Sequence, residues 1–140
     1  MATFKGGNVQ IVKPGDELYF DKPVKINEHG NNADIKVHIL DDATMKSNGF
    51  RRFISGEDNW WYFCNKVYKD ITFNMTIYDR GDWTIDILDE WFCQPYDYQA
   101  MYESGKYSPV VLTVKKNVDE IMDSFVHKGI ISGWKVGDYI

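Results

Sequence analysis

The amino-acid sequence predicts an α+β fold, in which a mostly antiparallel sheet packs against one well-defined C-terminal helix. Three observations predict this class. Several short segments alternate apolar and polar residues, as half-buried strands do, and one later segment spaces its apolar residues as an amphipathic helix does. The chain has 140 residues, of which 44% are hydrophobic and 16% aromatic. It therefore has the length and the apolar surface for a single folded domain spanning residues 1–140.

The N-terminal third has the pattern of short strands joined by turns. Pro14 and Gly15 favour a chain reversal, because proline presets the first turn position and glycine accepts a positive φ at the next. A reversal here places Ile11 opposite Leu18 on one apolar face. We therefore expect a hairpin around this turn.

The next two segments differ in their regularity. Residues 35–39 alternate strictly, with β-branched side chains at positions 35, 37 and 39. This pattern is typical of a half-buried strand, and it predicts that His38 points away from the core. Residues 41–58 carry no clean period, so we expect a long connection there. Loops of that length are uncommon in a compact domain and are often functional.

The clearest strands cover residues 60–68, 71–78 and 83–88. A two-residue loop between the last two strands would mix apolar and polar residues on one face. A three-residue loop over residues 79–81, with Gly81 in the left-handed third position, makes one face wholly apolar. This register pairs Ile77 with Trp83, Met75 with Ile85 and Phe73 with Ile87.

The C-terminal part contains the helical patterns. We expect residues 96–104 to form a short helix that ends at Gly105, and the apolar run 110–114 to form a buried strand. The best helix follows Asn117, which caps its first turn together with Glu120. Its apolar residues recur at helical spacing and Gly129 ends it; they are Val118, Ile121, Met122, Phe125 and Val126. The apolar tail 130–140 should dock onto the sheet.

Composition excludes several classes of protein. The 16 basic and 21 acidic residues give a net charge of −5, which argues against direct binding of nucleic-acid phosphates. The start of the chain lacks the apolar stretch of a signal peptide, and no apolar run is long enough to cross a membrane. We therefore expect a cytoplasmic protein without a membrane partner. Cys64 and Cys93 lie in aromatic clusters and are expected to be buried, reduced thiols, with a disulfide as the alternative.

No standard catalytic, cofactor or metal motif is present. The three histidines and two cysteines are too widely spaced for a usual metal site, and no phosphate-binding glycine loop occurs. Asp123 and His127 lie one helical turn apart, which is typical of a surface contact. We therefore expect no catalytic residues, no metal and no cofactor. An enzyme with a site assembled around Cys93 or His127 stays open as a third hypothesis.

Acidic residues are concentrated in one part of the sequence. Residues 79–103 hold seven acids and one base, whereas the other residues hold 14 acids and 15 bases. Tyrosines in the same stretch lie among polar residues and are expected to be exposed. Carboxylates beside exposed rings would suit a basic partner, although such acids can also simply solvate a surface. The predicted partner-binding residues are Asp82, Asp86, Asp89, Glu90, Asp97, Tyr96, Tyr98 and Tyr102.

These observations favour a non-enzymatic protein-interaction domain. By analogy of class, it would be a small inhibitor or adaptor, such as a phage accessory or immunity-type protein. Its expected partner is a basic protein, for example one that handles nucleic acid. The alternative is a small-molecule or carbohydrate-binding β domain that uses Trp60, Trp61 or Tyr62 as stacking platforms.

Overall fold

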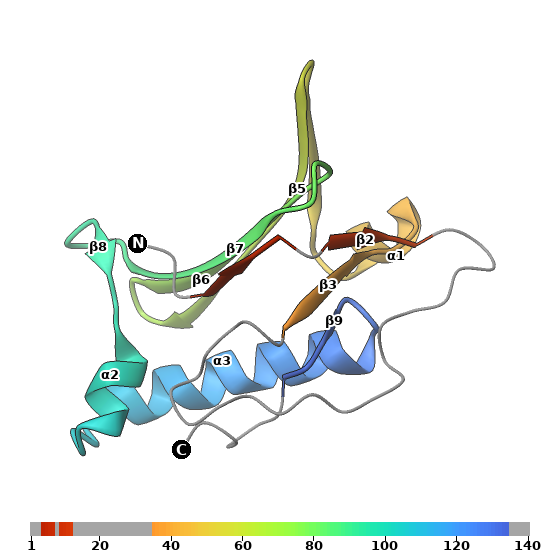
Figure 1. Ribbon diagram of the computed structural model, residues 1–140. Coiled ribbons are helices and arrows are strands. Elements are labelled where there is room, and N and C mark those ends of the chain that lie inside the picture. The colour runs from red at the N-terminus through yellow and green to blue at the C-terminus, as the bar shows by residue number, and fades with distance from the viewer. Residues whose placement is uncertain (1–3, 8, 13–34, 135–140) are drawn as a thin grey trace.

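The computed structural model describes residues 4–7, 9–12 and 35–134, and it confirms the α+β fold. A six-stranded antiparallel sheet lies along the long helix α3 (Pro109–His127), as Figure 1 shows. Its strand order is β1-β7-β6-β5-β4, and β8 also pairs with β7. The strands are β1 (Phe4–Gly6), β4 (Arg51–Ser55), β5 (Asp58–Tyr68), β6 (Ile71–Tyr78), β7 (Trp83–Asp89) and β8 (Gln94–Pro95).

A second, three-stranded sheet lies beside the first. It contains β2 (Val9–Ile11), β3 (Lys36–Ile39) and β9 (Ile131–Ser132), in the order β2-β3-β9. Strand β2 pairs with β3 in parallel, and β9 pairs with β3 antiparallel. The predicted turn at Pro14 and Gly15 lies outside the described residues, as does Leu18, the predicted partner of Ile11. The docking predicted for the C-terminal tail is confirmed as far as residue 134, since the Trp134 ring packs edge-on against Phe4 at 5.4 Å.

The register of the β6–β7 hairpin is the predicted one. Ile77 pairs with Trp83. Met75 pairs with Ile85, and Phe73 pairs with Ile87. Gly81 takes φ +121°, a conformation that side chains other than glycine rarely adopt. All six of these apolar side chains are buried on the face that looks toward α3.

Helix α3 covers that face with an apolar stripe, as its periodicity predicts. Val114, Val118 and Met122 are fully buried. Phe125 meets the Phe63 ring edge-on, with 5.0 Å between the ring centroids. Aromatic packing therefore joins the C-terminal half of α3 to β5.

The prediction of a strand over residues 110–114 is wrong, because these residues form the first turns of α3. Ser108 caps the helix by accepting a hydrogen bond from the Val111 backbone N–H at 3.2 Å. Pro109 occupies the first turn, where its missing N–H costs nothing. A short apolar run cannot be assigned to strand or helix from its composition alone. Asn117 therefore lies inside the helix, and its side-chain amide donates to the Val67 carbonyl at 2.7 Å.

The prediction of a long connection over residues 41–58 is also wrong. This segment contains the short helix α1 (Asp42–Ser47) and strand β4. Asp41 caps α1 by accepting from the Thr44 hydroxyl at 2.7 Å and from the Thr44 N–H at 3.0 Å, and these bonds lower the pKa of its carboxyl. Both faces of β4 are largely exposed, so the strand carries no alternation that the sequence could reveal. The short helix expected over residues 96–104 is confirmed as α2 (Tyr98–Glu103).

Two further expectations about burial are wrong. His38 is fully buried instead of pointing to solvent, because β3 is the central strand of the small sheet and is covered on both faces. Cys64 and Cys93 are both exposed free thiols, so neither is buried and they do not form a disulfide. Within the described ranges, no helix is long and apolar enough to cross a membrane.

Candidate partner-binding surface

The acids at the β6–β7 turn are neutralised by arginines. Asp79 accepts a hydrogen bond at 2.8 Å from Arg52. Arg80 bonds to Asp82 at 2.6 Å and to Asp58 at 3.0 Å, and its hydrogen bond holds the pKa of the Asp82 carboxyl below its usual value. This end of the sheet therefore offers little unbalanced negative charge to a partner.

Asp86 lies at mid-strand in β7, on the sheet face opposite α3. Its carboxyl is half-buried, and this desolvation raises its pKa. The neighbouring Asn74 links two strands, because it accepts from the Tyr62 hydroxyl at 2.6 Å and donates to the Thr72 hydroxyl at 2.9 Å. Thr72 in turn donates to Glu90 at 2.9 Å. The centre of the face is thus a hydrogen-bonded polar layer that ends at Glu90.

The chain then makes a tight turn over residues 89–93, which we call the acidic aromatic turn. One Asp89 carboxylate oxygen accepts from the backbone N–H groups of Trp91 at 3.1 Å and Phe92 at 3.3 Å. The Glu90 N–H donates to the Asp70 carbonyl at 2.9 Å, which ties the turn to the neighbouring strand connection. These bonds fix the backbone of the turn and satisfy its donors.

The turn holds its two large rings in solvent. Trp91 is 75% exposed and Phe92 is 66% exposed, although tryptophan is usually highly buried. Both rings border a shallow hollow of about 270 Å³ that is also lined by Tyr68, Lys69 and Asp70. Because Asp70 and Asp89 line the hollow with the rings, and Glu90 precedes Trp91 in the turn, the surface combines apolar area with carboxylates.

The three tyrosines of the predicted site differ in exposure. Tyr98 is fully buried in the core, so the expectation that it is exposed is wrong. Tyr96 is half-buried, and its burial together with the nearby Asp89 charge raises its pKa. Tyr102 is also half-buried and packs edge-on against Tyr107 at 5.0 Å. Asp97 caps α2 by accepting from the Ala100 N–H at 3.1 Å.

The structure therefore brings only part of the predicted set together. Asp89 and Glu90 lie in the acidic aromatic turn, whereas Asp82 lies at the opposite end of β7. The exposure of the Trp91 and Phe92 rings was not predicted, because the aromatic residues beside Cys93 were interpreted as the setting of a buried thiol. The polar residues before them and Pro95 after them were the signals of a turn.

The residues of the alternative binding hypothesis are split between the two faces of the sheet. Trp61 is buried on the inner face, with the Arg52 guanidinium over its ring at 5.1 Å. Trp60 and Tyr62 are half-buried on the outer face, where Trp60 stacks on Phe53 at 5.4 Å. The stacking partner covers one face of the Trp60 ring.

The residues of the enzyme hypothesis are not brought together. Cys93 immediately precedes β8, which lies at the left of Figure 1, whereas His127 is the last residue of α3, whose C-terminal end lies at the right. His127 and Asp123 are exposed and 3.5 Å apart, as expected for a surface contact. Within the described part of the chain, no cluster of His, Cys, Asp and Glu could hold a metal ion. Comparison with protein-family models, with curated proteins and with solved structures finds no match to this chain.

Proposed function

We propose that this protein is a non-enzymatic interaction domain that binds a basic protein through the acidic aromatic turn. The observation that carries the proposal is the 75% exposure of Trp91 on a backbone fixed by Asp89. Exposed aromatic area is unfavourable in water, and tryptophan is the residue most enriched among the anchors of protein interfaces. A backbone that is fixed before binding also loses little entropy when a partner covers the ring.

Charge around the turn supports a basic partner. Asp89 and Glu90 accept hydrogen bonds from uncharged donors, so these contacts leave their negative charge unpaired. Asp70 adds a third carboxylate beside the rings, where Lys69 is the one cation of the lining, so the acids outnumber the bases. Carboxylates around an aromatic anchor attract lysine and arginine during the encounter, and an arginine can also stack on the Trp91 ring.

An inhibitor or adaptor of a nucleic-acid-handling protein fits this surface best. Such partners present arginine and lysine side chains that normally contact phosphates. A rigid acidic turn can occupy that basic surface with carboxylates, and its two rings can add apolar contact.

A capture experiment at two salt concentrations tests the proposal. The double variant Trp91→Ala/Phe92→Ala is compared with wild type and with Ile54→Ala, which removes a side chain that is also 74% exposed but lies on the β4–β5 hairpin. We expect wild type and Ile54→Ala to retain the same basic protein at low salt, and the double variant to lose it. High salt should weaken the capture. Equal recovery by all three proteins would refute the assignment of the surface.

A second candidate function is carried by Trp60 and Tyr62 on the outer face of β5. Half-exposed rings beside polar strand residues can stack on sugars. A thermal-shift screen separates the two candidates, because a sugar that binds the native state raises the melting temperature. This second function would be favoured if a sugar raised the melting temperature of wild type and of Trp91→Ala but not that of Trp60→Ala.

A further inference from the structure

One edge of β5 is not covered by a strand. β4 pairs with β5 only from Asp58 to Tyr62, whereas β5 continues to Tyr68. Over residues 63–66, β6 occupies one side of β5, and no described strand occupies the other. A bare edge presents backbone donors and acceptors in the spacing of a strand.

The hairpin register shows which backbone groups point outward. The Tyr78 N–H donates to the Asp82 carbonyl at 2.9 Å, so alternation directs the even-numbered residues of β6 to β7 and the odd-numbered ones to β5. The β5 partners of those odd-numbered residues are Phe63 and Asn65. The N–H and C=O groups of Cys64 and Lys66 therefore point out of the bare edge.

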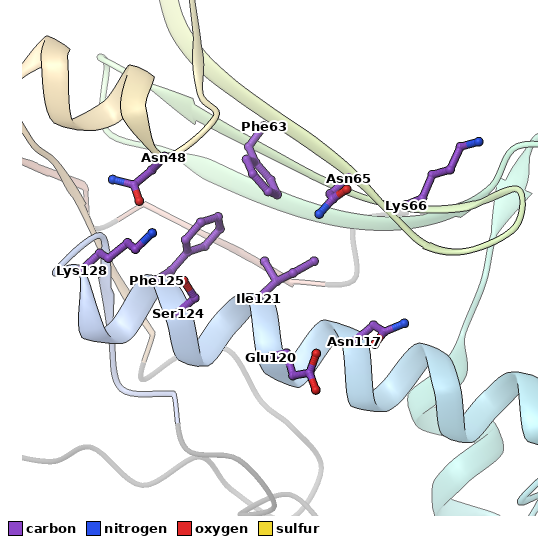
Figure 2. A pocket seen from close by; sticks show the side chains of 10 residues that line it. All are labelled: Asn48, Phe63, Asn65, Lys66, Asn117, Glu120, Ile121, Ser124, Phe125 and Lys128. Carbon is purple, nitrogen blue, oxygen red and sulfur yellow. The ribbon is translucent and has the colours of Figure 1, made fainter.

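A pocket of about 430 Å³ lies between this edge and α3, as Figure 2 shows. Its floor is apolar, because Phe63 from β5 and Phe125 from α3 point toward one another beside Ile121. Asn65 points from the strand toward the helix, and Ser124 lies on the helix beside Phe125. The pocket thus offers an apolar base and a polar rim beside backbone groups that no described strand pairs.

The charge at this pocket is opposite to that of the acidic aromatic turn. Lys128 points toward the pocket from the end of α3, and Lys66 lies at the other end and points outward. Neither lysine forms an ion pair with a described residue. Glu120, the acid of the lining, lies 3.9 Å from Lys116 on its own helix. The pocket therefore has a surplus of positive charge in an acidic protein.

We propose that the edge of β5 at Cys64 and Lys66 binds an extended peptide segment of a partner protein, with an apolar residue flanked by acidic residues. The peptide adds as a strand, and its backbone bonds to the outward groups of the edge. Side chains two positions apart face the same side of a strand. One apolar side chain then enters the pocket beside Phe63 and Ile121, which are partly exposed, and an acidic neighbour on the same side reaches Lys128.

This occupant explains all three features together. A compact small molecule would use the pocket but leave the strand edge unpaired, and a basic segment would be repelled by Lys128. The site lies on another part of the molecule than the acidic aromatic turn, so it does not rest on the function proposed above.

The test is a titration of the isotope-labelled full chain with a short peptide. Binding is monitored through the backbone amide signals in the NMR spectrum of the protein. The probe is acetyl-Glu-Val-Phe-Val-Glu-amide, in which both acids and the phenylalanine face one side. We expect the amides of Cys64 and Lys66 to shift, and the same peptide with lysine in place of glutamate to bind about tenfold more weakly. Lys128→Glu should weaken binding of the acidic probe about fivefold, whereas Lys106→Glu, an exposed lysine on a distant loop, should leave it unchanged.

Two N-methylated probes test the added strand itself. One is methylated on both valine nitrogens and the other on the three remaining residues. A strand bonds to the edge through alternate N–H groups, so one probe should lose binding and the other retain it. Equal binding by both, shifts confined to residues outside the edge and the pocket, or no binding at millimolar peptide would overturn the proposal. Self-association of the chain that protects the Cys64 amide would overturn it in favour of a second copy.

Discussion

Burial changes the chemistry of His38 more than that of any neighbouring group in the small sheet. The side chain lies in the central strand β3, and desolvation lowers its pKa from 6.5 to about 4, with a smaller contribution in the same direction from Lys36. The folded state therefore keeps this imidazole neutral at a pH where the unfolded chain already binds a proton.

This difference predicts an acid-sensitive stability. Neutral His38 makes its full contribution to the free energy of unfolding above pH 6.5. That contribution is lost as the pH falls from 6.5 to about 4, because the unfolded state takes up the proton first. The loss should approach about 3 kcal/mol. Urea unfolding across this range measures it, with His38→Leu as the reference that cannot titrate. Parallel pH profiles for the two proteins would contradict the assignment.

Gly81 is the second residue whose conformation decides a local structure. Its φ of +121° closes the β6–β7 turn, and a Cβ there would strain the backbone although space is available. Gly81→Ala should lower the free energy of unfolding by about 1–3 kcal/mol. Gly7→Ala is the matched control, because no atom lies within 4 Å of its added Cβ. Thermal or urea unfolding of both variants compares them, and equal stability would show that the turn tolerates a side chain.

At the scale of elements, capping decides where α3 begins. Ser108 accepts from the Val111 N–H, whereas Asn117 bonds to Val67 from inside the helix. Ser108→Ala should therefore destabilise the protein by about 1 kcal/mol through the lost cap. Thr113→Ala, an exposed change within the same helix, should be neutral or slightly stabilising. The difference between the urea midpoints of the two variants tests whether α3 begins at Ser108. If Ser108→Ala did not lower the free energy of unfolding, the helix would begin elsewhere.

The same elements show what local sequence patterns can and cannot predict. The β6–β7 register followed from alternation together with one glycine, because a slip by one residue would expose an entire apolar face. The first turns of α3 were missed, because the run 110–114 shows too little periodicity to separate a helix from a strand. The burial of His38 was missed because it depends on β9, which reaches β3 from the other end of the chain.

The candidate site was predicted only in part for a related reason. Asp89 and Glu90 were identified from charge, which the sequence displays directly. The exposure of Trp91 and Phe92 depends on a turn whose carboxylate cap forms only when the strand ends at Asp89. Composition favours burial for such rings, and only the tertiary structure shows that nothing among the described residues covers them.

At the scale of the whole molecule, the charge of the described residues is divided between regions instead of forming one patch. Asp79 and Asp82 lie with arginines at one end of β7, and Asp89 and Glu90 lie without them at the other. A partner should therefore be steered by the second end alone. Asp89→Asn/Glu90→Gln keeps both acceptor oxygens and should slow association with the captured partner by about tenfold at low salt.

Asp79→Asn/Asp82→Asn is the matched control for that charge effect, because it also removes two negative charges, at the arginine-rich end. Its association rate constant should stay close to that of wild type. Surface plasmon resonance at two salt concentrations measures both variants. Equal slowing by the two changes would mean that net charge, and not the position of Asp89 and Glu90, steers the partner.

The most direct measurement of the proposed function is the dissociation rate of the captured partner from wild type and from Trp91→Ala. The ring is 75% exposed and touches little of the fold, so its removal should leave the unfolding free energy nearly unchanged. If Trp91 anchors the interface, affinity falls by about thirtyfold, mainly through faster dissociation. An unchanged dissociation rate in a folded Trp91→Ala protein would contradict the account.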